Sequence, residues 1–295
     1  MGWGIAIAFM QAVCWAGTGL LLKQLSTKMD LYLANGLRAL IGLAFLLPVV
    51  WITGGQADVA LLTPYRVGVL LLTIVLGALI GEVLYIGALK RLGVGRTLPI
   101  SNCHPLFTVL LSAPLLGEPL RLPIIIGAVV VLLGVYVVAR PDSRKQHPDH
   151  VDARTISTGI AMAVGAALCW GLGTVILAFG TEAINPALAN AVRLPLVVLA
   201  SLAIAGRRGT IAQIKGFDRG TVVLLIVAGI VSWVLTRTLY VAAVQKIGPS
   251  MTAIIGATAP VYAIPMSWAL IGERPRRSAL AGTVLTVIGI ILVVR

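Results

Sequence analysis

Two side chains of opposite charge lie deep inside long apolar runs of this chain. Glu82 stands within residues 67–89, and Arg237 stands within residues 220–244. A charge in apolar surroundings is costly unless it faces a partner or a wet cavity. Arg237 is suited to bind a carboxylate and Glu82 to bind an ammonium group, so that together they would hold a zwitterion. An ion pair that only locks or gates two helices would produce the same pattern.

Aromatic residues accompany both charges at helical spacing. Tyr85 lies three residues after Glu82. Trp233 lies four residues before Arg237, and Tyr240 lies three residues after it. Because residues three or four apart share one face of a helix, each run presents a stripe that is both charged and aromatic.

Two further tryptophans lie near the middle of apolar runs. Gln11 and Trp15 share one face of the run 3–22, and Trp170 lies in the run 158–180. A buried tryptophan needs an acceptor for its indole N–H, and its ring suits an apolar or aromatic ligand. Tryptophans at the ends of membrane helices often serve as interfacial anchors, but these two lie away from the ends. We therefore expect both to flank a ligand.

The run 97–116 contains a polar patch, Ser101-Asn102-Cys103-His104-Pro105. Proline breaks the helical hydrogen-bond ladder, so the freed carbonyls need water or a side chain. Two interpretations of Asn102 and His104 stay open. They contact substrate at a kink that lines a wet cavity, where His104 could also carry a proton, or they satisfy the carbonyls of the kink itself.

Two more arginines, Arg38 and Arg193, lie inside the runs 32–53 and 187–206. A long arginine side chain can extend along its helix to the headgroups while its stem stays in lipid. We expect both guanidinium groups to reach the membrane surface in this way.

The composition shows which elements must position these residues. Of the 295 residues, 59% are hydrophobic and 11% are charged, and the mean hydropathy is +1.01, whereas soluble domains average roughly 25% charged residues. A membrane-spanning helix needs about 20 apolar residues. We predict an all-α integral membrane protein with ten transmembrane helices, at residues 3–22, 32–53, 67–89, 97–116, 122–139, 158–180, 187–206, 220–244, 250–271 and 278–294.

The net charge of +13 does not indicate a nucleic-acid partner, because the basic residues gather in short groups at the ends of the runs. Lys90-Arg91 and Arg207-Arg208 are examples. Such groups contact anionic headgroups and fix the orientation of the chain. They concentrate in the connections after the odd-numbered runs, which favours an outer location for both termini. We expect membrane lipids and a small-molecule substrate as partners, no nucleic acid, and a monomer.

The sequence repeats itself after 155 residues without a gap. We assign residues 1–140 and 158–295 to the two repeats and residues 141–157 to a polar linker. Because each repeat holds five runs, the second must cross the membrane in the opposite direction to the first. Inverted repeats around a midplane site are typical of secondary transporters. The register is kept by rare residues: Trp15 and Trp170, Arg38 and Arg193, Tyr85 and Tyr240, Pro105 and Pro260, and Gly117-Glu118 and Gly272-Glu273. It places Arg237 at the position equivalent to Glu82.

The chain resembles the EamA branch of the drug/metabolite transporter superfamily over its whole length. The resemblance is carried by Trp15 and Trp170, Arg38 and Arg193, Pro105 with Gly117-Glu118, and Pro260 with Gly272-Glu273. The resemblance implies a ten-helix bundle with a central cavity and alternating-access export of aromatic and other neutral amino acids across the bacterial inner membrane. Export of cationic drugs or of nucleotide-sugar-like metabolites on the same scaffold is the alternative. The candidate substrate-binding residues are Gln11, Trp15, Glu82, Tyr85, Asn102, His104, Trp170, Trp233, Arg237 and Tyr240.

The motifs of common enzyme classes are missing from the sequence. We find no nucleotide-binding loop, zinc-protease motif, nucleophile elbow or dinucleotide fingerprint in a suitable context. We therefore expect no catalytic residue, no cofactor and no metal. The connections are also too short to offer the soluble binding surface of a scaffold protein.

Overall fold

The computed structural model describes residues 2–119, 121–139, 153–271 and 277–294, and all regular structure in these ranges is helical. The predicted fold class, an all-α membrane protein, is confirmed. The α-helices are α1 Gly2–Ser26, α2 Leu31–Ile52, α3 Pro64–Ile74, α4 Glu82–Leu92, α5 Val94–Ser101, α6 His104–Leu116, α7 Leu122–Ala139, α8 Ala153–Thr181, α9 Pro186–Arg207, α10 Arg219–Gly229, α11 Arg237–Gly256, α12 Ala259–Ile271 and α13 Arg277–Val294. Two 3-10 helices, η1 Gly55–Leu61 and η3 Thr210–Gly216, and two π-helical segments, η2 Val75–Gly81 and η4 Ile230–Thr236, complete the described structure.

The ten predicted runs are helical apart from short turns inside two of them. Residues 64–92 form one continuous span through α3, η2 and α4. The run 97–116 is divided by a turn at Asn102-Cys103, and the run 250–271 is divided at the equivalent turn, Ala257-Thr258. Within the described residues, six helical stretches are long and apolar enough to cross a membrane, and the apolar helices at 104–116, 122–137 and 281–294 are shorter.

The repeat predicted from the sequence recurs element by element. Helix α9 begins and ends 155 residues after α2, and the same offset relates η3 to η1, α10 to α3 and η4 to η2. The backbone conformation follows the same register. Gly54 and Gly209 both have a φ near +70°, at 75° and 69°, and so do Gly93 and Gly248, at 71° and 79°. Positive φ values are accessible to glycine without steric cost, so these positions fix matching turns in both repeats.

The chain folds into two compact units, and each takes helices from both repeats. The first unit comprises Met1–Ile74 and Leu177–Lys246, and the second comprises Val75–Ile176 and Ile247–Arg295. The boundaries fall within helical spans rather than in loops. One lies where η2 begins, and another lies just before Gly248, whose non-helical backbone interrupts α11.

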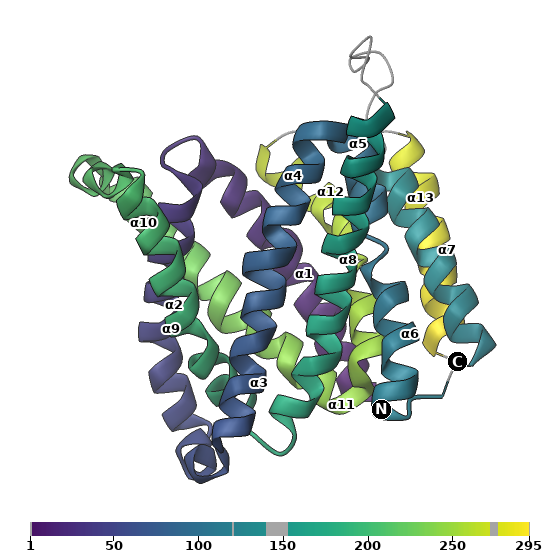
Figure 1. Ribbon diagram of the computed structural model, residues 1–295, viewed down its shortest axis with the longest axis horizontal. Coiled ribbons are helices and arrows are strands. Elements are labelled where there is room, and N and C mark those ends of the chain that lie inside the picture. Colours follow the sequence, from purple (N-terminus) through teal and green to yellow (C-terminus); the bar gives the residue numbers. More distant parts are fainter. Residues whose placement is uncertain (1, 120, 140–152, 272–276, 295) are drawn as a thin grey trace. The chain divides into compact units, whose positions relative to one another are not determined.

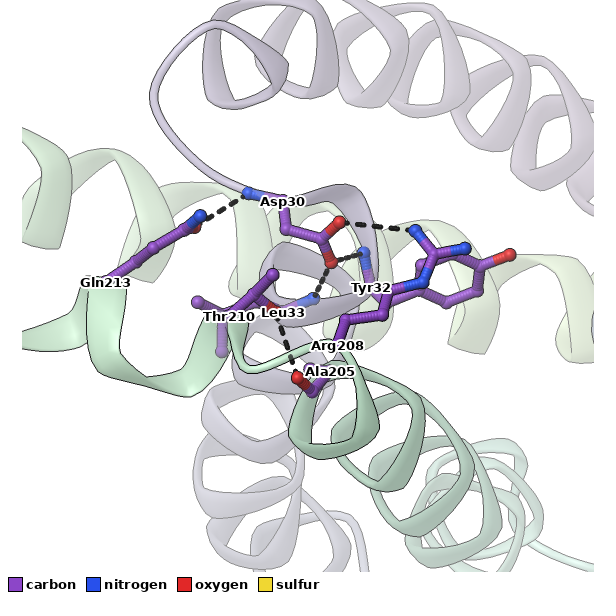
Figure 2. Close-up of polar contacts among 7 residues, drawn as sticks. All are labelled: Asp30, Tyr32, Leu33, Ala205, Arg208, Thr210 and Gln213. Atoms are coloured by element: carbon purple, nitrogen blue, oxygen red, sulfur yellow. Dashed lines mark hydrogen bonds and ion pairs between the residues drawn. The ribbon is translucent and has the colours of Figure 1, made fainter.

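The first unit holds α2 and α9 together through contacts at both helix ends. Figure 2 shows Asp30, whose carboxylate caps α2 by accepting hydrogen bonds from the backbone N–H groups of Tyr32 and Leu33. The backbone N–H of Asp30 donates to Oε1 of Gln213 at 2.9 Å, and Nη1 of Arg208 lies 3.5 Å from its carboxylate. The start of α2 therefore lies beside the chain that follows α9.

The opposite ends of the same two helices make the equivalent contacts. Asn185 caps α9 and donates its backbone N–H to Oδ2 of Asp58 at 2.7 Å. Its amide also donates to Oγ1 of Thr53 at 3.1 Å. Asn185, Asp58 and Thr53 are the repeat equivalents of Asp30, Gln213 and Arg208. Reciprocal contacts of this kind define a two-fold relation, so α2 and α9 run antiparallel, as an inverted repeat requires.

The second unit shows the same relation between α7 and α13, which lie side by side in Figure 1. Gly127 packs against Gly289 and Val293, whereas Gly134 packs against Gly282 and Thr286. Rising numbers in α7 thus meet falling numbers in α13, and the helices are antiparallel. Small residues allow the two backbones to approach closely, as is common in membrane helix pairs.

Candidate functional site

The two charged residues that the sequence analysis assigned to substrate binding, Glu82 and Arg237, each directly follow a π-helical segment. Arg237 follows η4, and Glu82 follows η2, which occupies the equivalent position in the other repeat. A hydrogen bond from Oγ1 of Thr236 to the carbonyl of Val231, five residues earlier, closes the wide turn of η4 at 2.7 Å. Single π-helical turns inside α-helices are rare and occur often at functional sites. Apolar periodicity gave no signal for these segments.

In the first unit, Arg237 lies against two tryptophan rings. Its Cζ atom is 5.0 Å from the ring centroid of Trp15 and 5.5 Å from that of Trp233. Both distances are typical of cation–π contacts. The two rings differ in access, because Trp15 is 43% exposed and Trp233 is 8% exposed. The arrangement combines a positive charge with an accessible aromatic face.

Three neighbouring helices hold Trp233 in place. A Cβ atom at Gly42 of α2 would collide with the Cβ of Trp233, so only glycine permits this approach. The side-chain amide of Asn190 in α9 donates a hydrogen bond to the carbonyl of Trp233. On the next turn, Thr18 of α1 and Thr236 share a hydrogen bond at 3.4 Å. The π-helical segment is thus fixed by α1, α2 and α9.

Arg38 does not reach the membrane surface, and the prediction that it would is wrong. Its side chain is 3% exposed. Nη1 donates to Oγ of Ser232 at 3.0 Å, Nη2 donates to Oδ1 of Asn35 at 2.9 Å, and Nε lies 3.4 Å from the carbonyl of Ala34. Because these acceptors solvate the guanidinium inside the unit, the side chain has no need of the headgroups.

Arg193 is also buried, at 7% exposure, so the same prediction is wrong for this residue. Its surroundings differ from those of Arg38. Within the described residues, Nε and Nη1 of Arg193 have no hydrogen-bond partner. Arg237, which lies close enough for the two positive charges to repel each other, and Tyr240 are both neighbours of Arg193. The sequence gave no sign that this arginine would face inward.

Two more polar atoms of candidate residues in the first unit are buried and lack a hydrogen-bond partner among the described residues. They are Oε1 of Gln11 and Nε1 of Trp233. Buried polar atoms are normally satisfied, and each exception calls for an explanation such as a ligand or water. In total, the first unit contains five of the candidate substrate-binding residues: Gln11, Trp15, Trp233, Arg237 and Tyr240.

In the second unit, Trp170 is the centre of an aromatic group. Its ring centroid lies 5.4 Å from that of Tyr85 and 6.1 Å from that of His104, which meets it edge-on. Its indole N–H donates to the carbonyl of Gly77 at 3.1 Å, which supplies the acceptor that the sequence analysis required. A Cβ at Gly81 would lie 2.7 Å from the indole nitrogen, so a glycine here makes room for the ring.

The predicted helix break is confirmed at Asn102. Helix α5 ends at Ser101, Asn102-Cys103 forms a turn, and α6 begins at His104 with Pro105 in its first turn. Oγ1 of Thr108 donates to the carbonyl of His104 at 3.0 Å. Asn102 and His104 are both half-buried. Together with Glu82, which is exposed, Tyr85 and Trp170, they form the second group of candidate residues.

Antiparallel helical repeats with charged and aromatic residues inside apolar spans are the architecture of secondary transporters. Comparison with known proteins agrees. Both halves of the chain, residues 2–140 and 157–295, match the EamA-like transporter family. The protein belongs to the EamA-like transporter family.

Two similar proteins extend this result over the full length. An uncharacterized transporter of Archaeoglobus fulgidus is 25% identical over 289 residues, which cover 98% of this chain and 96% of the relative. A solved crystal structure shares the fold, with a TM-score of 0.73 at 20% identity over 99% of this chain and 96% of the other. The protein is thus a multi-pass membrane transporter of a small molecule and not an enzyme.

Proposed function

We propose that this transporter exports aromatic and other neutral amino acids across the bacterial inner membrane by alternating access. The observation that carries the proposal is the position of Arg237 against the rings of Trp15 and Trp233. A guanidinium pairs well with a carboxylate, and an indole face suits an aromatic side chain. One cluster therefore offers both groups that an aromatic amino acid needs.

The ammonium group of the substrate is assigned to Glu82. This residue begins α4 inside a continuous apolar span, where an acidic side chain is costly without a function. Tyr85 lies one turn after Glu82 on the same helix, and the ring of Trp170 packs against that of Tyr85 from a neighbouring helix. Both rings add aromatic surface for the substrate. The roles proposed for Glu82 and for Arg237 are tested separately by the variants described below.

Alternating access follows from the inverted repeat. Residues 1–140 and 158–295 serve as the two repeats, joined by the linker 141–157, most of which lies outside the described residues. Two inverted copies of one fold can exchange conformations, and this exposes a shared site first to one side and then to the other. We further propose that the protein acts as a monomer with both termini on the outer face.

The function is tested by efflux from proteoliposomes that hold the purified protein. The vesicles are loaded with labelled phenylalanine, tryptophan or leucine, with and without a pH gradient, and protein-free liposomes serve as the control. We expect efflux above the control for all three and fastest for the aromatic pair. Efflux equal to that of protein-free liposomes for every amino acid would contradict the proposal.

Export of aromatic organic cations is the second candidate, favoured by the group around Glu82. Tyr85 and Trp170 form a tilted ring pair beside this carboxylate, and cations bind to aromatic faces next to a negative charge. A labelled quaternary aromatic ammonium ion in the same assay separates the two functions. Efflux of this cation without efflux of phenylalanine would favour the second candidate.

A further inference from the structure

The two repeats hold equivalent arginines in different states. Arg38 and Arg193 are related by the 155-residue offset, and both are buried. Arg38 donates to the side chains of Asn35 and Ser232. Arg193 leaves Nε and Nη1 without a partner among the described residues. Since the chain places the same residue at both positions, its surroundings must account for the difference.

The repeats differ at one of the two positions that supply side-chain acceptors to Arg38. The equivalent of Ser232 is Gly77, which has no hydroxyl group to accept a hydrogen bond. The equivalent of Asn35 is Asn190, whose side-chain Nδ2 donates to the carbonyl of Trp233. The second repeat therefore keeps the arginine and the asparagine and lacks a counterpart of the Ser232 hydroxyl group.

A buried guanidinium without acceptors destabilises the unit that contains it. The four acidic residues of the first unit do not relieve this cost, because each lies at a helix end or in a connection: Asp30 and Asp218 are N-caps, Asp58 lies in η1, and Glu182 lies in the turn after α8. The positive charge of Arg237 acts on Arg193 as well and adds to the cost. An anion bound between the two arginines would relieve this cost.

We propose that Arg193 binds the carboxylate of the substrate next to Arg237, with the indole N–H of Trp233 as an additional donor. This inference rests on the proposed function and deepens it, because it assigns a second arginine to the carboxylate. Nε and Nη1 of Arg193 are buried donors without an acceptor among the described residues, and a guanidinium donates charge-assisted hydrogen bonds to carboxylate oxygens. The substrate class is therefore a carboxylate with an apolar or aromatic body, and Arg38 has only a structural role.

The test uses full-length purified protein in detergent and measures thermal stabilisation by three related compounds. Phenylalanine carries both charged groups, 3-phenylpropionate lacks the ammonium, and phenylethylamine lacks the carboxylate. The variants are Arg193→Gln and Arg193→Lys, with Arg208→Gln in the exposed contact of Figure 2 as the control.

We expect phenylalanine and 3-phenylpropionate to stabilise the wild type and the Arg208→Gln variant. Arg193→Gln should weaken both affinities by about ten- to a hundredfold, because hydrogen bonds to a charged group are lost. Arg193→Lys should lie between these values. Equal affinities in Arg193→Gln and the wild type would overturn the inference.

Stability without ligand provides a second readout. Arg193→Gln removes an unsatisfied charge and should leave the unfolding temperature unchanged or raise it, whereas Arg38→Gln strands Ser232 and Asn35 and should lower it. If Arg193→Gln lowered the unfolding temperature as much as Arg38→Gln does, Arg193 would have a structural role and the inference would be overturned.

The same measurements distinguish failure of the proposed amino-acid export from failure of the anion site at Arg193. If no amino acid binds to the wild type, amino-acid export is contradicted, and a panel of other carboxylates and inorganic phosphate is measured in the same way. Stabilisation by one of them that is lost in Arg193→Gln supports the anion site. Absence of any such compound overturns it.

Discussion

Arg237 gives the candidate site its chemical character, because one charge and two indole rings meet there. The sequence predicted this group, since Trp233 and Arg237 share a helical face and Trp15 recurs in both repeats. The burial of Arg38 and Arg193 was not predicted. Ser232, which holds Arg38, is 194 residues away in the chain, and spacing along one helix cannot reveal such a partner.

The variant Arg237→Gln tests whether the charge of Arg237 binds the carboxylate of the substrate. The change keeps hydrogen-bonding capacity but removes the charge that we assign to the substrate carboxylate. We expect phenylalanine efflux to fall at least about tenfold, which corresponds to the loss of roughly one charge-assisted hydrogen bond. Efflux from proteoliposomes with equal amounts of folded protein is the measurement. Unchanged efflux would remove Arg237 from the site.

The variant Glu82→Gln tests whether Glu82 binds the ammonium group of the substrate and not its carboxylate. If this carboxylate binds the ammonium group, the variant should lose affinity for phenylalanine by about tenfold or more and keep its affinity for 3-phenylpropionate. Thermal stabilisation by each compound measures both values. An equal loss for both compounds would show that Glu82 has a structural role.

At the scale of elements, the two π-helical segments are the feature that sequence patterns missed. Both occupy the same register in the repeats and end directly before Glu82 or Arg237. A π-helical turn adds one residue to a helix that remains apolar throughout, so hydrophobic periodicity does not change enough to report it. The ten spans, in contrast, were predictable from length and hydropathy, because lipid imposes both.

The close contact between α7 and α13 yields a prediction on stability. A Cβ at Gly134 would lie 2.5 Å from the backbone nitrogen of Thr286, whereas nothing lies within 4 Å of a Cβ at Gly68 of α3. Gly134→Ala should therefore destabilise the protein by about 1–3 kcal/mol through overpacking. Gly68→Ala should be neutral or stabilising by up to about 1 kcal/mol. The measurement is the thermal unfolding midpoint of the two variants in detergent. Equal midpoints would contradict the close contact between Gly134 and Thr286.

The N-cap of α10 gives a prediction on pH. Hydrogen bonds from the hydroxyl and the backbone N–H of Thr221 lower the pKa of Asp218, and Lys28 lies 3.8 Å from its carboxylate. A carboxyl whose pKa is lowered by folding stabilises the fold above its unfolded pKa, near about 4, and loses this contribution as pH falls through the folded pKa.

Thr221→Val removes the hydroxyl donor and should raise the pKa of Asp218 toward its ordinary value. The unfolding midpoint, measured as a function of pH, should then be lower than that of the wild type above about pH 4, and the difference should shrink as pH falls. Thr210→Val is the matched control, because its hydroxyl donates only to the carbonyl of Ala205 (Figure 2) and has no titratable partner among the described contacts. The same pH-dependent difference in both variants would contradict the assignment.

At the scale of the whole molecule, duplication and inversion explain the architecture. The offset of 155 residues was visible in rare residues, and parity of the spans predicted the inversion that the antiparallel pairs α2–α9 and α7–α13 display. The division into two compact units was not predictable, because each unit takes helices from both repeats. Such interleaving depends on contacts between distant segments, and a local pattern carries no information about them.

The central claim is that these inverted repeats carry an amino acid by alternating access, and counterflow tests it most directly. Proteoliposomes are loaded with unlabelled phenylalanine and diluted into a trace of labelled phenylalanine. We expect a transient accumulation of label above equilibrium, because the excess of unlabelled phenylalanine inside competes with the label for exit on the carrier. We also expect that phenylethylamine inside the vesicles does not replace phenylalanine. Uptake of label at the same rate in loaded and empty vesicles would contradict the claim.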